Sequence, residues 1–328
     1  MVTINDIAKM AGVAKSTVSR YLNGGSVSQK TKDKIDIIIK QTDYIPNTFA
    51  QSLKMKNTNM IGTIIPRLNS YAANEILTSV DEELLKRNYH LLITNTDQDV
   101  KRELENLYSL SRQKVAGILL MATVITKAHI EAIKKIGIPV ILLGQRNDVT
   151  YSIIHDDFAA GKSIGEHVVA LGHKEILYLG VRKSDEAVGI TRRQGIFEGL
   201  KSGKDLNVTE LEVNFDYTLA YNFLKDYLKT SNATYIICST DNIALAAYKA
   251  IITIGKKIPD DVSVSGFGGY AITDLVTPAI TTVKYPFKEM GRIAVENLLR
   301  IIQGEELPKC ITLSNEFIGK ESTRKFKS

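Results

Sequence analysis

The chain has 328 residues, of which 44% are hydrophobic and 24% are charged, and its net charge is +6. This length allows two or three domains, and the composition is that of an ordinary globular protein. No apolar run approaches the roughly 20 residues of a membrane-spanning helix, and the N-terminus does not have the pattern of a secretion signal. We therefore expect a cytoplasmic protein with no membrane partner, in which Cys238 is a buried thiol rather than a metal ligand.

The positive charge is concentrated at the beginning of the chain. Residues 1–60 contain nine basic and four acidic side chains, and so carry +5 of the +6. A small basic segment attached to a nearly neutral body is typical of proteins that bind a polyanion. The alternative is a basic surface that is only solvated.

Residues 1–46 contain the patterns of three short helices. Thr3 and Asp6 have the form of a capping box at the start of the first helix, which ends at Gly12. Ser28 caps the third helix, whose inward face holds isoleucines at helical spacing: Ile35, Ile38 and Ile39. Two helices joined by a glycine turn and followed by a third form a helix-turn-helix, although an ordinary three-helix cap has the same spacing.

The second helix, over residues 16–22, has a small inward side that consists of Val18 and Leu22. Its outward side, with the residue before it, holds basic and hydroxyl side chains: Lys15, Ser16, Thr17, Ser19 and Arg20. A helix with such an edge fits the major groove of DNA, where these groups reach base edges and phosphates.

From residue 60 onward, short apolar runs alternate with helical patterns. The runs cover residues 60–66, 89–94, 115–121, 138–144, 152–156, 175–180, 234–238 and 262–268. The helical patterns cover residues 101–114, 127–136, 158–171, 191–201, 218–229, 241–255 and 287–303. Continuous apolar strands separated by helices predict an α/β fold with parallel, doubly wound sheets covered on both faces. The length accommodates two sheets of four to six strands.

Ligands of such folds bind beyond the carboxyl ends of the strands. The residues found there are Pro66-Arg67, Asn95-Thr96, Gln145-Arg146, Asp156-Asp157, Thr240-Asp241 and Gly268-Gly269. They combine carboxylates, arginines and neutral polar groups, which together donate and accept hydrogen bonds. This lining suits a neutral, hydroxyl-rich ligand, and a carbohydrate is the obvious class.

Three segments near the beginning of the chain carry a more specific pattern: TINDIAKMAGVAKSTVSRYLNG, VSQKTKDKI and DYIPNTFAQSLK. They closely resemble the head of the lactose-repressor (LacI/GalR) family of bacterial transcription regulators. The resemblance implies that Lys15 and Ser16 contact bases, with Arg20 one turn further on. It implies phosphate contacts by Thr3, Ser19, Asn23, Ser28 and Thr31. Thr17, Tyr44 and Asn47 complete the expected DNA-binding set.

Residues 47–57, NTFAQSLKMKN, look like the hinge helix of that family. The resemblance implies that paired hinge helices of a dimer enter the minor groove and that Leu53 wedges between base pairs. An isolated helix this short is marginal in water. We therefore expect it to become ordered only on operator DNA.

The resemblance extends over the body in the segments EHVVALGHKEILYLG, STDNIALAAYKAI, IPDDVSVSGFGG, PAITTVKYP and GRIAVENLL. It implies a two-lobed, periplasmic-binding-protein-like effector domain behind the helix-turn-helix domain. The expected boundaries are 1–46 for the DNA-binding domain, 47–59 for the hinge helix and linker, and 60–328 for the effector-binding and dimerisation domain. Lobe 1 is expected at about 60–156 and 286–314, and lobe 2 at about 157–285 and 315–328.

By position, the resemblance implies effector contacts by Asp156, Arg192, Thr240 and Asp241. Arg67 and Arg146, which follow predicted strands, complete the expected effector-binding set together with Tyr71 and Tyr285. Tyr285 either closes the pocket with its aromatic face or packs at the junction of the lobes. Arg193 competes with Arg192 for the role of the family's ligand-binding arginine. Two departures are expected to alter selectivity: Gly268 stands where the family usually has Asp, and Thr240 replaces the commoner Asn. The segments GFGGY and STVSRYLNGGSVSQKTK are most similar to the sucrose-operon repressors of low-GC Gram-positive bacteria.

We therefore expect a homodimeric, sugar-responsive repressor of a carbohydrate-utilisation operon, which binds a pseudo-palindromic, double-stranded operator and is released by an effector between the lobes. The near alternatives are a family regulator with a non-sugar effector or a protein corepressor. The distant one is a sugar-binding protein without a DNA role. An enzyme is not expected, because adjacent Asp156 and Asp157 cannot flank one bond. We expect no cofactor and no metal, since His155, His167 and His173 share no metal-ligand face.

Overall fold

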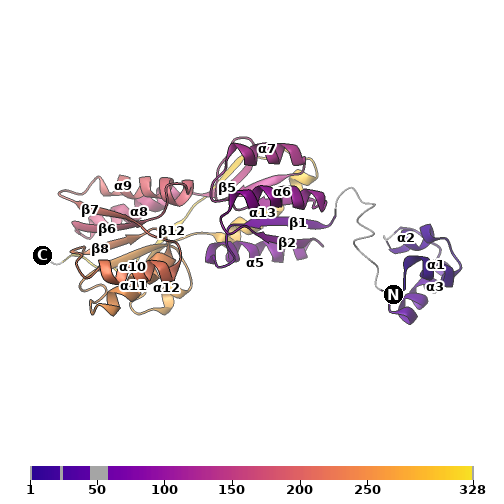
Figure 1. Ribbon diagram of the computed structural model, residues 1–328, viewed down its shortest axis with the longest axis horizontal. Coiled ribbons are helices and arrows are strands. Elements are labelled where there is room, and N and C mark those ends of the chain that lie inside the picture. Colours follow the sequence, from indigo (N-terminus) through magenta and orange to yellow (C-terminus); the bar gives the residue numbers. More distant parts are fainter. Residues whose placement is uncertain (1, 23–24, 45–57, 327–328) are drawn as a thin grey trace. The chain divides into compact units, whose positions relative to one another are not determined.

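The computed structural model of the protein describes residues 2–22, 25–44 and 58–326, and it divides into two compact units, Met1–Thr58 and Asn59–Ser328. We call the first unit the head and the second the body. The head contains α1 (Ile4–Ala11), α2 (Lys15–Leu22) and α3 (Gln29–Thr42) (Figure 1). Within the described residues, every strand belongs to the body.

The helices of the head form close to where the sequence predicts, and α2 begins at Lys15, one residue before the predicted start. The Thr3 hydroxyl accepts from the Asp6 amide, and the Thr3 amide donates to the Asp6 carboxylate at 3.0 Å, so the capping box is formed. Gly12 follows α1 in the left-handed conformation (φ 64°), which glycine adopts without strain. The Ser28 hydroxyl accepts from the Thr31 amide and caps α3.

The head has a small core to which α2 contributes little. The fully buried side chains are Ile7, Ala8, Ala11, Val18 and Ile35. Val18 is the only one of these from α2, while Tyr21 and Leu22 are half-buried. The Tyr21 hydroxyl donates a hydrogen bond to Asp36 and so ties α2 to α3. One edge of α2 is thereby anchored, and the other is left at the surface.

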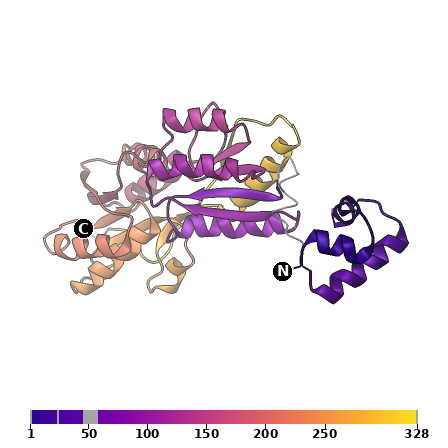
Figure 2. The same cartoon turned by 45° about the vertical axis from the view of Figure 1, so that its right-hand side comes forward.

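The body is built on two six-stranded sheets, which we use to define two lobes (Figures 1 and 2). The lobe 1 sheet has the order β11-β5-β4-β3-β1-β2, and all its pairings are parallel. Its strands are β1 (Met60–Ile65), β2 (His90–Asn95), β3 (Gly117–Leu120), β4 (Val140–Leu143), β5 (Tyr151–His155) and β11 (Cys310–Leu313).

The lobe 2 sheet has the order β12-β10-β9-β8-β6-β7, and only β12 is antiparallel to its neighbour. Its strands are β6 (Glu175–Gly180), β7 (Asn207–Glu212), β8 (Tyr235–Cys238), β9 (Ser263–Gly268), β10 (Thr281–Lys284) and β12 (Glu316–Ile318). The chain crosses between the lobes three times, after β5, after β10 and after β11.

Helices cover both faces of each sheet, as parallel strands that are buried on two sides require. In lobe 1 they are α5 (Tyr71–Leu85), α6 (Val100–Arg112), α7 (Lys127–Ile136) and α13 (Phe287–Ile302). In lobe 2 they are α8 (Asp157–Ala170), η1 (Glu186–Arg192), α9 (Arg193–Leu200), α10 (Tyr217–Tyr227), α11 (Asp241–Thr253) and α12 (Ile272–Leu275). None of the described helices combines the length and apolar character needed to cross a membrane.

The expected α/β fold with a helical head is confirmed, and the eight predicted strands all form. Four strands were not predicted: β7, β10, β11 and β12. They are short or lie at sheet edges, and the exposed, polar positions of β7 give no continuous apolar run. The helix predicted over 191–201 begins at Arg193, because residues 186–192 form a π-helix, η1.

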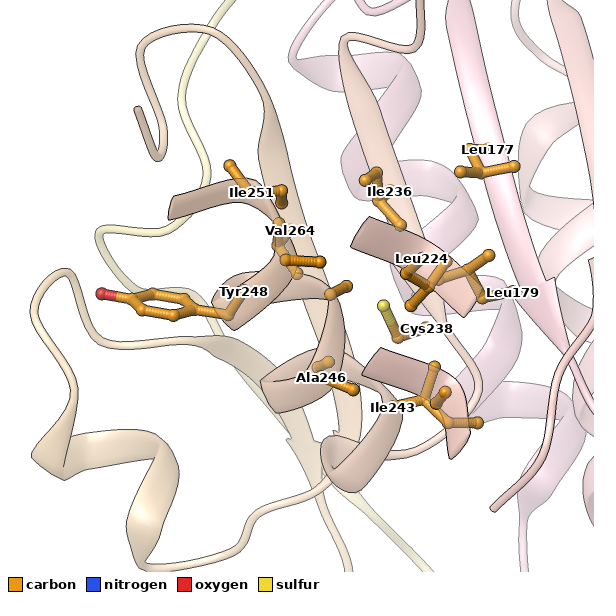
Figure 3. Close-up of a cluster of buried hydrophobic side chains, with 14 of the residues drawn as sticks. Leu177, Leu179, Leu224, Ile236, Cys238, Ile243, Ala246, Tyr248, Ile251 and Val264 are labelled. Carbon is orange, nitrogen blue, oxygen red and sulfur yellow. The ribbon is translucent and has the colours of Figure 1, made fainter. Parts of the chain in front are cut away.

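Cys238 is a free cysteine in the core of lobe 2, as expected. It lies among apolar side chains of α10, α11 and neighbouring strands, including Leu224, Ile236 and Ile243 (Figure 3). Burial raises the pKa of its thiol well above the ordinary value. The side chain therefore acts as a small hydrophobic group.

Candidate functional sites

The free edge of α2 presents the side chains that the sequence places there. Lys15, Ser16 and Arg20 are exposed, whereas Thr17 and Ser19 are half-buried. Around this edge, Thr3 and Ser28 are exposed but engaged as helix caps, and Thr31 and Tyr44 are half-buried. The predicted residues Asn23, Asn47 and Leu53, and with them the hinge segment 47–57, lie outside the described residues.

The body contains a cavity of about 210 Å³ lined by residues of both lobes. Its walls include the segments that follow β1, β4, β5, β6, β8 and β9 at their carboxyl ends, as the strand topology predicts. Four of the eight predicted effector residues line it: Arg67, Arg192, Thr240 and Tyr285. The other four do not: Tyr71, Arg146, Asp156 and Asp241.

A buried ion pair between Arg192 and Asp157 is the most strongly bonded feature of the cavity. The Arg192 Nε and Nη2 atoms donate to the Asp157 Oδ1 atom at 2.9 and 2.5 Å, and Nη1 donates to the Ser239 carbonyl at 2.6 Å. The Tyr285 hydroxyl donates to the same Oδ1 atom at 2.8 Å. Burial alone would lower the pKa of Arg192, but the Asp157 carboxylate outweighs that effect and raises it, so the guanidinium stays charged.

Two aromatic rings pack against the Arg192 guanidinium. Its guanidinium carbon lies 5.0 Å from the ring centroid of Phe267 and 4.9 Å from that of Tyr285. The positive charge over these ring faces gives a cation–π attraction. Arg192 is therefore fixed in position before any ligand contact.

Arg193, the competitor in the sequence, points elsewhere. Its Nε and Nη2 atoms donate to the two carboxylate oxygens of Glu210 at 2.8 and 2.7 Å, on the surface beside β7. Arg193 is not among the residues that line the cavity. The structure thus distinguishes two adjacent arginines that the sequence left as alternatives.

Asp156 and Asp241 hold the backbone rather than line the cavity. Asp156 caps α8, accepting from the Ala159 amide at 2.9 Å. Asp241 is fully buried and accepts from the Tyr270 amide at 2.9 Å and from the Thr282 hydroxyl at 2.7 Å. Burial raises the pKa of Asp241 to about 6, although these hydrogen bonds oppose the shift.

Tyr71 and Arg146 also have other surroundings. The Tyr71 ring stacks on Tyr270 with centroids 4.1 Å apart, and its hydroxyl accepts from the Ala271 amide, so it joins α5 of lobe 1 to lobe 2. The Arg146 side chain is 67% exposed and lies 3.8 Å from Asp148. Its neighbour Gln145 is the one that lines the cavity.

Arg67 faces the cavity from the end of β1. Its guanidinium carbon lies 4.7 Å from the ring centroid of Phe215, which belongs to lobe 2. Burial lowers its pKa, and its Nε atom has no hydrogen-bond partner within the described part of the chain. The half-buried Asp185 also lines the cavity, and loss of hydration raises the pKa of its carboxyl group. Arg67 and Asp185 place opposite charges on the two lobes.

Several lining residues were missed as site residues: Gln145, His155, Asp157, Asp185, Phe215 and Asn242. Gln145 and Asp157 belong to residue pairs that follow strands, so their positions pointed to the site. In each pair, however, the other residue was predicted as the effector contact. Asn242 follows a similar pair by one residue. Asp185 lies in a loop before a π-helix and carries no sequence signal. Among the described residues, no group of three or more His, Cys, Asp or Glu side chains is placed to hold a metal ion.

Comparison with known proteins matches both units. Residues 3–47 match the family described as bacterial regulatory proteins, lacI family, and residues 166–323 match the periplasmic binding protein-like domain. The chain is 41% identical to the sucrose operon repressor of Staphylococcus xylosus over 320 residues, which cover 96% of this chain and 98% of that one. The chain belongs to the LacI family. This LacI-family protein is a DNA-binding regulator of transcription and not an enzyme.

Other relatives of this LacI-family protein agree with that assignment over almost its whole length. It is 31% identical to the ribose operon repressor of Haemophilus influenzae, with 92% of each chain covered. Its structure superposes on that of the lac repressor dimer bound to operator and the anti-inducer ONPF with a TM-score of 0.87 and 25% identity. That superposition covers 98% of this chain and 99% of the other.

Proposed function

We propose that this protein is a sugar-responsive repressor of a carbohydrate-utilisation operon, with sucrose as the first candidate effector. It acts in the cytoplasm as a homodimer whose two heads bind the half-sites of a pseudo-palindromic operator. One observation carries the proposal. The chain that has the exposed Lys15, Ser16 and Arg20 edge also has a cavity with charged and hydroxyl groups from two lobes.

The cavity chemistry supports an uncharged, hydroxyl-rich effector. Arg192 is neutralised by Asp157, and Arg67 stands opposite Asp185, so the arginines and carboxylates balance. Such groups donate and accept hydrogen bonds in the mixture that sugar hydroxyls require. The similarity to the Staphylococcus xylosus sucrose operon repressor favours sucrose within that class.

The effector acts through the angle between the lobes. A ligand held by groups of both lobes stabilises one lobe arrangement over another, and that preference is what releases the operator. In allosteric proteins such coupling amounts to about 1–3 kcal/mol. In our proposal, the hinge segment 47–57 transmits the change to the heads, with Leu53 as the residue that wedges between base pairs.

The direct test is fluorescence anisotropy of the protein on labelled DNA from upstream of its own operon, with and without sucrose. The salt concentration is held constant, because phosphate contacts make the affinity salt-dependent. We expect tight binding that sucrose releases. Tight binding that sucrose leaves unchanged would support the repressor function but exclude sucrose as the effector. The absence of specific binding would contradict the repressor itself.

A further inference from the structure

His155 is the last residue of β5 and stands where the chain first crosses from lobe 1 to lobe 2. Its ring lies edge-on to Tyr285, with centroids 4.8 Å apart, and to Phe287, with centroids 5.5 Å apart. Both neighbours belong to the second crossing, which follows β10. His155 also lines the cavity. It therefore lies at the junction between the ligand cavity and the segments that join the lobes.

Both ring nitrogens of His155 are buried, and neither has a hydrogen-bond partner among the described residues. The nearby polar groups are already engaged with one another, since Arg192 and Tyr285 both donate to Asp157. A buried polar atom without a partner is costly. Together with the Arg67 Nε atom, the two nitrogens are thus the buried side-chain atoms of the cavity wall that lack a hydrogen-bond partner among the described residues. Arginine only donates hydrogen bonds, whereas an imidazole can also accept them.

The His155 ring is neutral at physiological pH. Burial lowers its pKa to about 4; the Asp157 carboxylate raises it, and the Arg192 charge lowers it further. A neutral imidazole has one N–H donor and one acceptor nitrogen. A hydroxyl group matches it, because a hydroxyl both accepts and donates. A phosphate or carboxylate oxygen only accepts, and would leave the acceptor nitrogen without a partner.

We propose that His155 contacts the effector directly and selects for ligand hydroxyl groups. This inference rests on the proposed function, because it concerns the same cavity. It goes beyond the proposed function because it assigns the selectivity for ligand hydroxyl groups to His155, a lobe 1 residue where the chain first crosses to lobe 2. The Arg192–Asp157 pair is not needed for that selectivity.

The test compares the wild type with His155→Phe, which keeps an aromatic ring against Tyr285 and Phe287 but removes both nitrogens. Replacing unpartnered polar atoms by apolar ones of similar shape is neutral or stabilising. We expect the Tm of the sugar-free variant to equal the wild-type value or exceed it by about 2–4 °C. Sucrose affinity, measured by titration calorimetry, should fall at least tenfold.

His167→Phe is the matched control. The His167 Nε2 atom hydrogen-bonds to the Thr323 hydroxyl at 3.1 Å, and His167 does not line the cavity. This variant should lower the sugar-free Tm and leave sucrose affinity intact. If His155→Phe instead lowers the Tm as His167→Phe does, His155 is a structural residue and the inference is wrong.

Monodeoxy analogues of sucrose identify the contact. One missing hydroxyl should weaken binding to the wild type and have no effect on His155→Phe, whereas the other positions should matter equally in both. Equal sensitivity at every position would overturn the inference. If the wild type releases its operator with fructose, ribose or cellobiose but not with sucrose, the sucrose assignment fails. The same comparison with that sugar and its deoxy forms then decides the role of His155.

Discussion

Arg192 and Asp157 come from separate elements, η1 and α8, and meet with both side chains buried. Each charge is tolerable there only because the other is present, since an isolated buried charge is strongly unfavourable. The pair is the balanced centre of the cavity. In our proposal, ligand hydroxyls accept hydrogen bonds from the Arg192 N–H groups that do not bond to Asp157 or Ser239.

Arg192→Ala is expected to abolish release of the operator by sugar, because it removes the fixed donors and leaves Asp157 unpaired. The same loss should reduce the free energy of unfolding by about 3–5 kcal/mol. Operator affinity without sugar should be retained at temperatures where the variant is folded. Urea denaturation and fluorescence anisotropy measure the two effects.

Arg193→Ala is the control for that variant. Its ion pair with Glu210 is partly exposed, so its loss should change stability by at most about 1 kcal/mol. The sugar response should be normal. Normal sugar release by Arg192→Ala would show that the effector site lies elsewhere.

His155 gives a second residue-scale prediction, for pH. Its pKa is about 4 in the folded protein and about 6.5 when the chain is unfolded. The unfolded chain therefore binds a proton first. The folded protein loses stability as the pH falls from about 6.5 toward 4, because its buried imidazole resists protonation. Between pH 7 and pH 5, the wild type should lose about 2 kcal/mol more than His155→Phe.

Urea denaturation of both proteins at the two pH values measures this difference. Asp241 shifts in the opposite direction, since its raised pKa favours the folded state at low pH. Because Asp241 is present in both proteins, its contribution cancels in the comparison. Equal losses in the two proteins would mean that His155 titrates at its ordinary pKa.

At the scale of elements, the packing of α8 on α9 and η1 positions Arg192. Glycines stand where the helix backbones touch. A Cβ atom on Gly161 would lie 2.1 Å from the Arg192 carbonyl oxygen, and one on Gly195 would lie 2.0 Å from that of Phe158. Neither contact can be relieved by rotating a side chain. The close approach of these helices thus depends on the absence of side chains at the interface.

Gly161→Ala should therefore displace Arg192 from Asp157 without changing any cavity side chain. We expect a lower Tm and a sugar affinity at least several-fold weaker, measured by thermal unfolding and titration calorimetry. Ser163→Ala on the same helix is the control, because its hydroxyl only bonds back to the Ala160 carbonyl. Wild-type sugar affinity in Gly161→Ala would mean that the position of Arg192 is not set by this packing.

The hinge segment is the other element with a testable role. An isolated helix over residues 47–57 is too short to be stable alone, so the prediction remains that it forms on the operator. Leu53→Ala should weaken operator binding with little effect on sugar affinity. Unchanged operator affinity would remove the wedge from the mechanism. Hydrogen exchange should show protection of residues 48–56 only with DNA, and equal protection in both states would contradict the prediction.

At the scale of the whole molecule, effector and operator binding are linked through a single chain. Three crossings join the lobes, and the cavity has walls on both. A ligand between lobes changes operator affinity only by its differential affinity for the two lobe arrangements. The factor by which sugar weakens operator binding must then equal the factor by which operator DNA weakens sugar binding.

Sucrose should weaken operator binding by a factor of about 5–150, and saturating operator should weaken sucrose binding by the same factor. Anisotropy with and without sucrose gives the first value, and calorimetry with and without operator DNA gives the second. In Arg192→Ala, sucrose should no longer change operator affinity and operator DNA should no longer change sucrose affinity, so both factors should equal one. Unequal factors in the wild type would show that the sugar and the operator are not bound by the same species.

Features that depend on local spacing can be predicted from the amino-acid sequence alone. Apolar runs and helical periodicity predict nearly every central strand and most helices, because burial of those side chains requires a period of two or 3.6. The caps at Thr3 and Ser28 are likewise local hydrogen bonds. The exposed edge of α2 follows from how little of that helix is apolar.

Only the tertiary structure decided which side chains share the cavity. The cavity is lined by Asp157 and not by Asp156. It is also lined by Thr240 and Asn242, whereas Asp241 between them does not line it. The direction of a side chain at a strand end depends on how the next helix begins. Asp157 meets Arg192 and Tyr285 over separations of 35 and 128 residues, and no local pattern encodes such meetings. The unpartnered nitrogens of His155 arise from the same packing of distant elements.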